Sequence, residues 1–508
     1  MATAMPRTLP LLLVASTGCA MTVLDTNVVG VVLPTIARDL HASFADVEWV
    51  ISSYVLCFAA LLLPAGAIAD RYGRRRVFLA GITFFALASL ACGLAPSAGA
   101  LYLARAAQGV GAAFLLAPAL AIIGHGFHDP AARGRAWAIW GGIMGLTMVL
   151  SPLLGGLINQ WLGWRWAFHV NLPLCALLAA AVPMFIEESR DPASRPLDLP
   201  GIGLFALAMF HLTWALIDGP GLGWASPAVL RRLGIGVALS IAFVVVERRR
   251  AHPMLDLRLF ADLPFSGSVL AMFAYAATAQ VMASLLPQFL QNGRGETALR
   301  AGLGMLPFAL AMLVFPQVAR RLSARMDSRA LLSLGLAVVA LGNLAMVAAA
   351  TRPALPMLML AMALLGTGGG LLNGETQKAI MGTVPPHRAG MASGISTTAR
   401  FSGILIGFSG LGAVLAGTTR HVVEQAMPAA HLPVDARLID HIVAGDLQRA
   451  LQAYPADVAA TVSGIARSGY QHGFAQAFLV AGIAAALAAL LVWTSMRRTA
   501  PDGLAAAS

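Results

Sequence analysis

The sequence predicts an all-α integral membrane protein, and three observations lead to this prediction. Of its 508 residues, 58% are hydrophobic and only 11% are charged, whereas soluble domains carry roughly a quarter charged residues. The mean hydropathy is +0.77. The apolar residues gather in runs of about 20 or more, the length that crosses a bilayer as a helix. These observations argue against a soluble enzyme, a disordered chain and a secreted disulfide scaffold.

Fourteen apolar runs are long enough to span a membrane. The first begins like a secretory signal, but it continues past Cys19 to Leu33, which favours a membrane span over a cleaved signal. The predicted spans are 9–34, 48–68, 77–95, 98–124, 136–158, 167–186, 200–218, 230–246, 265–289, 301–319, 329–350, 355–376, 389–416 and 474–495.

The basic residues predict the orientation of these spans. The net charge is +11, but the arginines lie in short clusters between apolar runs, which does not indicate nucleic-acid binding. Cytoplasmic segments of membrane proteins carry an excess of Arg and Lys. With the N-terminus inside, most basic residues fall on the cytoplasmic side. We therefore predict a multi-pass protein of the cytoplasmic (inner) membrane with both termini in the cytoplasm.

A weak internal repeat predicts two six-helix halves. Leu33-Pro34 and Leu286-Pro287, for example, are separated by about 253 residues. Paired halves are typical of transporters whose substrate site lies between them near the midplane. The predicted division is an N-terminal six-helix half over residues 1–190, two inserted linker helices over 191–260, and a C-terminal six-helix half over 261–508.

The C-terminal half contains the one long connection, residues 417–473, which this topology places outside. Apolar residues from Val434 to Leu451 recur at helical spacing. The segment is predicted to form one or two short helices over the outer face, with a disordered cap as the alternative.

The turn after the second span combines glycines, an aspartate and arginines. Gly66 allows close helix approach and Gly73 suits a tight turn. Asp70 falls at the C-terminal end of a helix, where a carboxylate opposes the helix dipole and needs a cationic or amide partner. A positive-inside anchor would explain the arginines but not the spacing of the other residues.

This turn resembles the G-x-L-A-D-R-x-G-R-R signature of the major facilitator superfamily, with Ile68 at the Leu position. Four other segments resemble motifs of its fourteen-helix drug:proton antiporter branch. They are residues 24–34 (L-D-x-T-V-V-N-V-A-L-P in the family), 105–111 (R-x-x-Q-G-x-G), 151–156 (G-P-x-x-G-G) and 164–173 (W-R-W-x-F-x-x-N-x-P). The sequence departs from these patterns at Asn27, Gly30 and Ser151, and Ala324 stands where Asp70 would repeat in the second half.

The resemblance implies a multidrug efflux transporter with a fourteen-helix major facilitator fold, which exports amphipathic drug-like compounds in exchange for protons. Its inner-gate motif would consist of Gly66, Asp70, Arg71, Gly73, Arg74 and Arg75. Its antiporter motif would consist of Ser151, Pro152, Gly155 and Gly156 and would seal the protein against leak. An ordinary kinked helix is the alternative for the second motif.

Charged residues inside the spans are candidates for the transport mechanism. A charge at the bilayer centre costs at least about 2.5–3.5 kcal/mol, so it should face a cavity or a partner. Asp25 and Arg105 both lie in the outer half of the membrane, and we predict that they couple proton movement to transport. A permanent Asp–Arg pair that holds helices together is the alternative. Further cavity candidates are Asn27, Gln108, Arg400 and Glu375; a helix-pairing role is equally open for Arg400, and a surface pair with Lys378 for Glu375.

The sequence predicts neither an enzyme nor a metal site, because the histidines lack ligand spacing and no nucleophile–base set is visible. No phosphate-binding loop is visible, so energy must come from an ion gradient and no cofactor is expected. The expected partners are a small-molecule substrate, protons and the lipid bilayer, with a periplasmic adaptor protein as a further candidate. Two other functions stay open: a dedicated exporter of an amino acid, siderophore or secondary metabolite, and a non-transporting membrane sensor or assembly partner.

Overall fold

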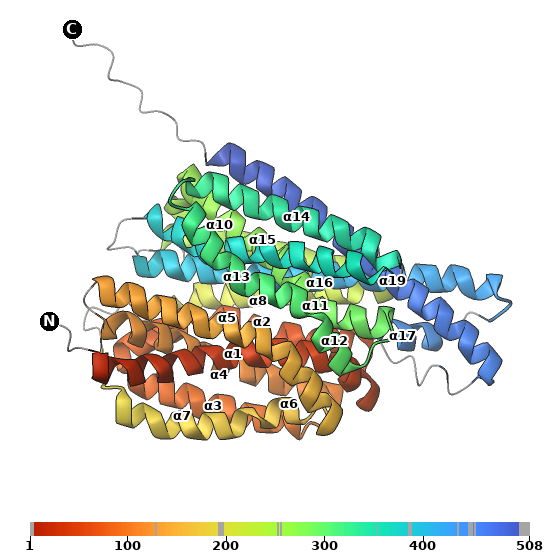
Figure 1. Cartoon of the computed structure of the whole chain (residues 1–508), viewed down its shortest axis with the longest axis horizontal. Coiled ribbons are helices and arrows are strands. Elements are labelled where there is room, and N and C mark those ends of the chain that lie inside the picture. Colours follow the sequence, from red (N-terminus) through yellow and green to blue (C-terminus); the bar gives the residue numbers. More distant parts are fainter. Residues whose placement is uncertain are drawn as a thin grey trace, which may run out of the picture.

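A computed structural model describes residues 5–496 apart from 128–129, 191–197, 251–252, 254–256, 353, 385–388, 434–435, 445–450 and 452–453. The described residues form helices joined by short turns, with no strand among them. The helices run along a common direction (Figure 1). Helix α1 begins and α19 ends at one end of the bundle, which we call the terminal end. The short helix α17 lies at the opposite end, which we call the α17 end.

Among the described residues, fourteen helical segments are long and apolar enough to cross a membrane, which confirms the predicted number. Several spans consist of consecutive helices, such as α6 with α7 and α12 with α13. The elements are α1 (Met5–Asp39), α2 (Phe44–Tyr72), α3 (Arg74–Gly93), α4 (Ala98–Gly126), α5 (Pro130–Trp161), α6 (Trp166–His169), α7 (Asn171–Phe185), α8 (Leu199–Leu222), α9 (Pro227–Arg249), η1 (Leu257–Ala261), α10 (Leu263–Tyr275), η2 (Ala276–Gln280), α11 (Val281–Gln288), η3 (Phe289–Gly293), α12 (Ala298–Gly304), α13 (Leu306–Leu322), α14 (Ser328–Thr351), α15 (Leu355–Gly382), α16 (Ala389–Ala429), α17 (Ala436–Ala444) and α19 (Ala456–Ser495).

Local sequence sets several helix boundaries. Ser43 accepts a hydrogen bond from the backbone N–H of Asp46, and Asp46 accepts one from the backbone of Ser43, so α2 begins with a capping box. Ser97 caps α4 through its hydroxyl. Gly73 ends α2 at φ +112°, a conformation that favours glycine, and α3 starts at the next residue.

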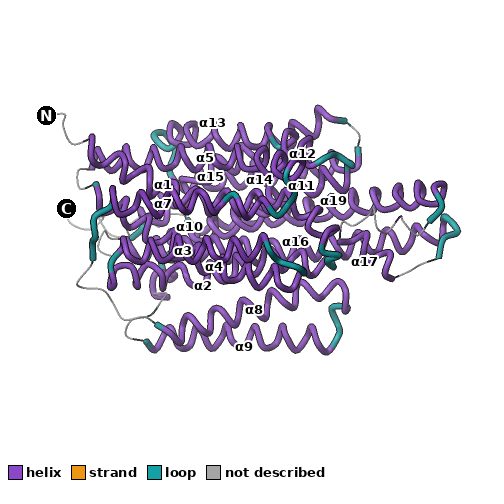
Figure 2. The backbone as a smooth tube through the Cα atoms, turned by 90° about the horizontal axis from the view of Figure 1, so that it is seen from below, coloured by secondary structure: helices purple, strands orange, loops and turns teal. Residues whose placement is uncertain are grey.

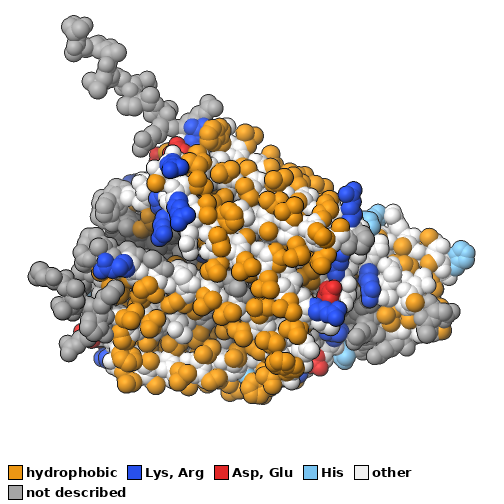
Figure 3. Space-filling model, viewed as in Figure 1, with side chains coloured by type: hydrophobic (Ala, Val, Ile, Leu, Met, Phe, Trp, Pro, Cys, Tyr) orange, Lys and Arg blue, Asp and Glu red, His pale blue; other side chains and the backbone are white. Residues whose placement is uncertain are grey.

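A broad apolar surface covers the middle of the bundle. Figure 3 shows hydrophobic side chains over most of this surface, with Lys and Arg gathered toward the two ends. The exposed hydrophobic side chains include Leu103 on α4, Leu177 on α7 and Leu360 on α15, all more than 60% exposed. Lipid is the solvent that suits such a surface.

The helices form two sets with the same packing pattern, the first helix set (α1–α7) and the second helix set (α10–α19). In the first set, α2 and α3 pack on α4, and α3 also packs on α7. In the second set, α13 and α14 pack on α15, and α14 also packs on α19. The sets meet where α2 contacts α16, α1 contacts α11 and α5 contacts α12 and α13.

Helices α8 and α9 form a hairpin at the edge of the bundle (Figure 2). Helix α8 packs against α2 of the first helix set and against α16 of the second. Trp49 on α2 lies 5.6 Å from Phe210 on α8, measured between ring centroids. The hairpin therefore covers the line along which α2 and α16 meet.

The structure differs from the sequence prediction over residues 417–473, where a long loop was expected. Helix α16 continues to Ala429 and α19 begins at Ala456, so both helices project beyond the apolar belt at the α17 end. The short helix α17 packs on α2 and α16. Hydropathy missed these extensions because a helix outside the lipid needs only one apolar face, here including the buried Val423 and Val462. Helix α17 lies within the segment from Val434 to Leu451 where short helices were expected, and residues 434–435 and 445–450 of that segment lie outside the described residues.

Candidate functional site

Asp25 and Arg105 form a buried ion pair in the first helix set. Arg105 Nη1 lies 2.5 Å from Asp25 Oδ2, and each residue is only 1% exposed. Asp25 comes from the middle of α1 and Arg105 from α4, where the 3.6-residue period turns both toward the interior of the set. The structure thus brings these two candidate residues into direct contact.

Three further polar residues complete the cluster around Asp25. Gln108 Nε2 donates to Asp25 Oδ1 at 2.8 Å, and Asn171 Nδ2 donates to the same oxygen at 3.0 Å. Both amides also donate to the hydroxyl of Ser89, at 2.8 Å and 3.4 Å. We call Asp25, Arg105, Gln108, Asn171 and Ser89 the Asp25 cluster. It joins α1, α3, α4 and α7, and all five residues are buried.

Arg105 is also held by α2. Its Nε donates to the backbone carbonyl of Val50 at 3.1 Å. The Tyr54 ring lies 4.1 Å from the guanidinium carbon, close enough for a cation–π interaction, and the Phe168 ring lies 5.8 Å away. The Arg105 side chain therefore connects α1 and α2.

The Asp25 carboxylate has a donor at each oxygen, since Arg105 contacts Oδ2 while Gln108 and Asn171 contact Oδ1. Both oxygens of the carboxylate therefore have hydrogen-bond partners within the protein. A buried charge was expected to face a cavity or a partner, and the described structure shows a partner, Arg105.

The inner-gate motif forms the turn between α2 and α3 at the terminal end. Asp70 Oδ1 accepts a hydrogen bond from Arg74 Nε at 2.8 Å, so the cationic partner predicted for Asp70 is present. Glu188 also binds this turn: its Oε1 accepts from the backbone N–H of Arg75 at 3.1 Å, and its Oε2 accepts from that of Arg76 at 3.3 Å. Gly73 leaves room for this carboxylate, because an added methyl group would lie 2.6 Å from Glu188 Oε1.

The other members of the inner-gate motif lie around this turn. Gly66 is one turn closer to the centre of α2, where an added methyl group would meet the Ala117 side chain of α4 at 3.9 Å. Arg71 is exposed, with its guanidinium carbon 5.7 Å from the Tyr72 ring. No sequence motif indicated Glu188, which lies after α7 and more than a hundred residues from the turn that it binds.

The antiporter motif lies where α5 contacts both helix sets. An added methyl group at Gly155 would lie 3.1 Å from the Val31 side chain of α1. At Gly156 it would lie 2.8 Å from the Ala298 carbonyl oxygen, at the start of α12. Pro152 in turn faces Gly302 of α12, where an added methyl group would lie 2.6 Å from the proline carbonyl oxygen. Glycines at these positions allow backbone-to-backbone packing.

Ser151 keeps this packing despite its departure from the family pattern. It is fully buried, and its hydroxyl donates to the Thr147 carbonyl at 2.6 Å within α5. The hydroxyl is therefore satisfied without a partner on another helix.

The four cavity candidates lie in different places. Gln108 belongs to the Asp25 cluster. Asn27 donates to the Val23 carbonyl of its own helix at 2.8 Å. Arg400 donates to Gln280 Oε1 at 3.1 Å, at the end of the π-helix η2. Glu375 is 5% exposed and accepts from Lys378 at 3.2 Å and from Ser328 at 3.0 Å.

Contacts of Arg400 and Glu375 favour the simpler interpretations that the sequence left open. Glu375 and Lys378 form the expected i,i+3 pair, but the Glu375 carboxylate is buried and only Lys378 is at the surface. Gly403 and Gly407 follow Arg400 on α16 and pack on backbone atoms of Phe273 and Ala277. Arg400 therefore lies in a tight helix-packing region.

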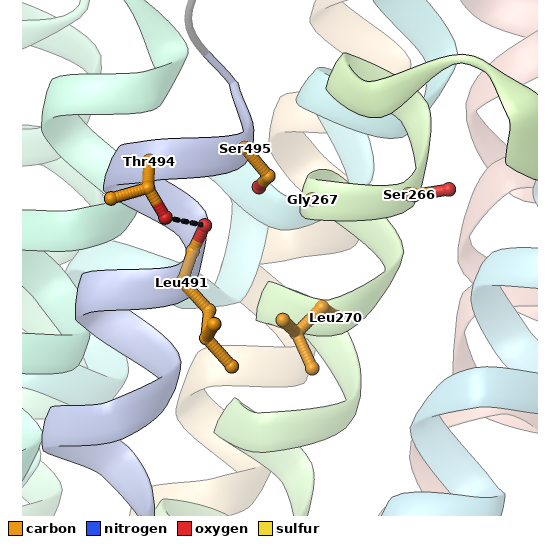
Figure 4. A pocket seen from close by; sticks show the side chains of 6 residues that line it. All are labelled: Ser266, Gly267, Leu270, Leu491, Thr494 and Ser495. Carbon is orange, nitrogen blue, oxygen red and sulfur yellow. Dashed lines mark hydrogen bonds between the residues drawn. The ribbon is translucent and has the colours of Figure 1, made fainter.

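A small pocket opens elsewhere, between α10 and α19 at the terminal end (Figure 4). Its lining contains no charged side chain: Ser266, Gly267, Leu270, Leu491, Thr494 and Ser495. None of the predicted site residues lines it.

Residues 15–408 match the Major Facilitator Superfamily. The chain is 37% identical over 445 residues to the multidrug resistance protein Stp of Mycobacterium tuberculosis, covering 86% of this chain and 82% of that protein. It is 31% identical to the multidrug efflux pump LfrA of Mycolicibacterium smegmatis, covering 96% and 95%. It is 30% identical to the tetracenomycin C resistance and export protein of Streptomyces glaucescens, covering 97% and 92%.

Solved structures show the same fold. A bacterial homologue of the human lysosomal transporter Spinster, in an inward-facing and unoccupied conformation, superposes with a TM-score of 0.66. The two sequences are 18% identical, and the match covers 98% of this chain and 100% of that one.

Proposed function

The chain belongs to the major facilitator superfamily, and we propose that it is a secondary active transporter that exports amphipathic drug-like compounds in exchange for protons. Relatives from three bacterial species are named for drug resistance or drug efflux, and each match covers more than four fifths of this chain. The Asp25 cluster supports proton coupling, because a buried carboxylate within a membrane span is a costly feature that function maintains. The protein is a multi-pass membrane protein.

We propose that residues 1–190 and 261–508 form two halves that rock against each other, with the helices of 191–260 as an insert. The terminal end faces the cytoplasm and the α17 end faces outward, in the cytoplasmic membrane. The positive-inside distribution of arginines supports this orientation. A periplasmic adaptor, where one exists, would meet the α17 end.

In the proposed cycle, the halves separate at the α17 end, water reaches the Asp25 cluster, and a proton binds Asp25 as substrate leaves. Protonation removes the charge that holds Arg105, and Arg105 relaxes against α2 through Val50 and Tyr54. The halves then close outside and open inside, Asp70 and Arg74 rearrange at the inner gate, and Asp25 releases its proton to the cytoplasm.

Everted membrane vesicles test this function. A fluorescent pH probe reports the collapse of an imposed proton gradient when ethidium, an amphipathic cation, is added. The wild-type protein is expected to respond and Asp25→Asn is expected not to. Asp39→Asn is the matched control, because Asp39 lies on the same helix, is 46% exposed and pairs with Arg165 at the surface. A normal response from Asp25→Asn would remove Asp25 from the coupling step.

A dedicated exporter of one secondary metabolite is the second candidate. The relative named for tetracenomycin C resistance and export, which matches nearly the whole chain, favours it. A susceptibility panel with a deletion strain and its complemented counterpart separates the two. Protection against several unrelated compounds supports multidrug export, and protection against a single chemical class supports the dedicated exporter.

A further inference from the structure

Glu48 is a second deeply buried carboxylate, and the mechanism above makes no use of it. It lies one turn into α2 at the α17 end and is 3% exposed. Its Oε2 atom has no hydrogen-bond partner, and no ion pair joins Glu48 to any residue that the structure describes. This environment differs from that of Asp25, whose carboxylate has three hydrogen-bond partners.

Glu48 lies against the opposite helix set. An added methyl group at Gly412 of α16 would overlap Oε1 of Glu48, so the carboxyl group rests on the backbone of α16. One further contact, between the rings of Phe58 and Phe401, joins the same two helices at 4.3 Å between centroids. The Glu48 carboxyl therefore lies in the contact surface that must open when the two sets separate at the α17 end.

The elements packed against α2 also carry charged or titratable groups. Those with recorded contacts bind other partners: Asp25 binds Arg105, Asp39 binds Arg165, Asp218 binds Arg232, and Arg420 binds Asp440. The charged groups and histidines described on these elements are Asp25, Arg38 and Asp39 on α1, Arg74, Arg75 and Arg76 on α3, Arg105 and His125 on α4, His211 and Asp218 on α8, Arg400, Arg420, His421 and Glu424 on α16, and Asp440 and His441 on α17. Within the described structure, none of them forms an ion pair with Glu48.

We propose that Glu48 is a proton-binding site of the outer gate, occupied by a proton while α2 and α16 are in contact and empty when they separate. An ionised carboxylate without a counter-ion is strongly destabilised when it is buried, whereas its neutral acid is destabilised far less. Closing α2 on α16 therefore requires a proton on Glu48, and losing that proton favours opening. The bond that forms and breaks is the O–H of the Glu48 carboxyl, with water at the opened gate as the acceptor.

This site deepens the proposed function, on which its place in the transport cycle rests. A proton-coupled antiporter must close its outer gate only after it has taken up a proton. If the gate closed without a proton, substrate would move without being coupled to the proton gradient. A proton requirement at the gate itself would enforce that order. Val50, which Arg105 contacts, lies two residues from Glu48 on the same helix. Arg105 of the Asp25 cluster therefore contacts the same helix that carries Glu48.

The distance across the α17 end provides the test. Spin labels are placed at Leu162, exposed after α5, and at Gln425, exposed on α16. Double electron–electron resonance then measures the distance between them in nanodiscs from mildly acidic to alkaline pH. In the wild type, the population with the longer distance is expected to increase roughly threefold or more as the pH rises. In Glu48→Gln, which mimics the protonated acid, the short distance should dominate at every pH.

Two further variants make the result interpretable. Glu424→Gln carries the same change on an exposed carboxylate of α16 and should behave as the wild type does. Glu48→Asp keeps an acid and should keep the pH dependence with a shifted midpoint, which provides a test even if Glu48→Gln does not fold. A wild type without pH dependence, or a Glu48→Gln or Glu48→Asp protein with the wild-type midpoint, would overturn the proposal. The measurement needs neither substrate nor transport, so its failure would leave drug export untouched.

Discussion

Asp25 Oδ2 and Arg105 Nη1 lie 2.5 Å apart in a position that solvent hardly reaches. The two residues are 80 positions apart in the chain and come from different helices. Both alternatives considered from the sequence involve this contact, because a proton-coupling pair and a permanent structural pair look alike while the carboxylate is ionised. The two alternatives differ in what happens when both charges are removed.

Removing both charges from the pair is expected to preserve the fold and abolish coupling. Arg105→Ala alone should destabilise the protein by about 3–5 kcal/mol, because it leaves Asp25 buried and without its counter-ion. Asp25→Asn combined with Arg105→Gln should restore most of that loss. Thermal unfolding in detergent measures stability, and proton flux in vesicles measures coupling. Full transport by the double variant would make the pair purely structural.

Asn171 is expected to matter for the same carboxylate although it carries no charge. Its amide donates to Asp25 Oδ1, so Asn171→Ala should cost about 1–3 kcal/mol of stability and reduce proton-coupled transport. Asn27→Ala is the control, because Asn27 bonds only to a carbonyl of its own helix. Equal effects from the two variants would contradict the special role of Asn171.

Gly156 is expected to tolerate no side chain. A methyl group there would meet the Ala298 backbone at 2.8 Å, and backbone cannot move aside as a flexible side chain can. Gly156→Ala should therefore separate α5 from α12, cost about 1–3 kcal/mol and slow transport. Gly141→Ala on the same helix meets nothing within 4 Å and should be neutral or stabilising, since alanine favours a helix by about 1 kcal/mol over glycine. Transport rates and melting temperatures of the two variants check this.

Glu188 is expected to hold the inner-gate turn in place. Its carboxylate accepts two backbone N–H groups at the start of α3, where negative charge also suits the helix dipole. Glu188→Gln should cost about 0.5–2 kcal/mol and slow transport without weakening substrate binding. The adjacent Glu187 is exposed, and Glu187→Gln should change neither property. Ethidium binding and uptake into everted vesicles measure the two effects separately.

The predictable part of this protein is what the bilayer constrains. Lipid demands long apolar helices, so the number of spans could be read from hydropathy. It also makes charge expensive, so Asp25 and Arg105 were visible as exceptions. Ser89 was not, because uncharged polar residues are common inside spans. Asn171 belongs to the motif at 164–173, but only the fold shows that it faces Asp25.

The burial of Glu48 could not be predicted from hydropathy. The sequence placed it at the first residue of a span, where a carboxylate would reach water without cost. The structure begins α2 at Phe44 and covers this end with α16 and α17, so the same residue is buried. The residues around Glu48 in the sequence do not indicate that neighbouring helices bury it. In the same way, the residues around Glu188 do not indicate that it binds a turn far away in the chain.

The hydrogen bond from Arg105 to α2 ends on a main-chain oxygen, the carbonyl of Val50. Every amino acid supplies that oxygen, so replacing residue 50 leaves the acceptor in place. A deep mutational scan of α2 would therefore score position 50 only by the size and shape of its side chain. The contact between the two helices would instead appear at Tyr54, whose ring packs on the guanidinium, and in a scan of α4 at Arg105 itself.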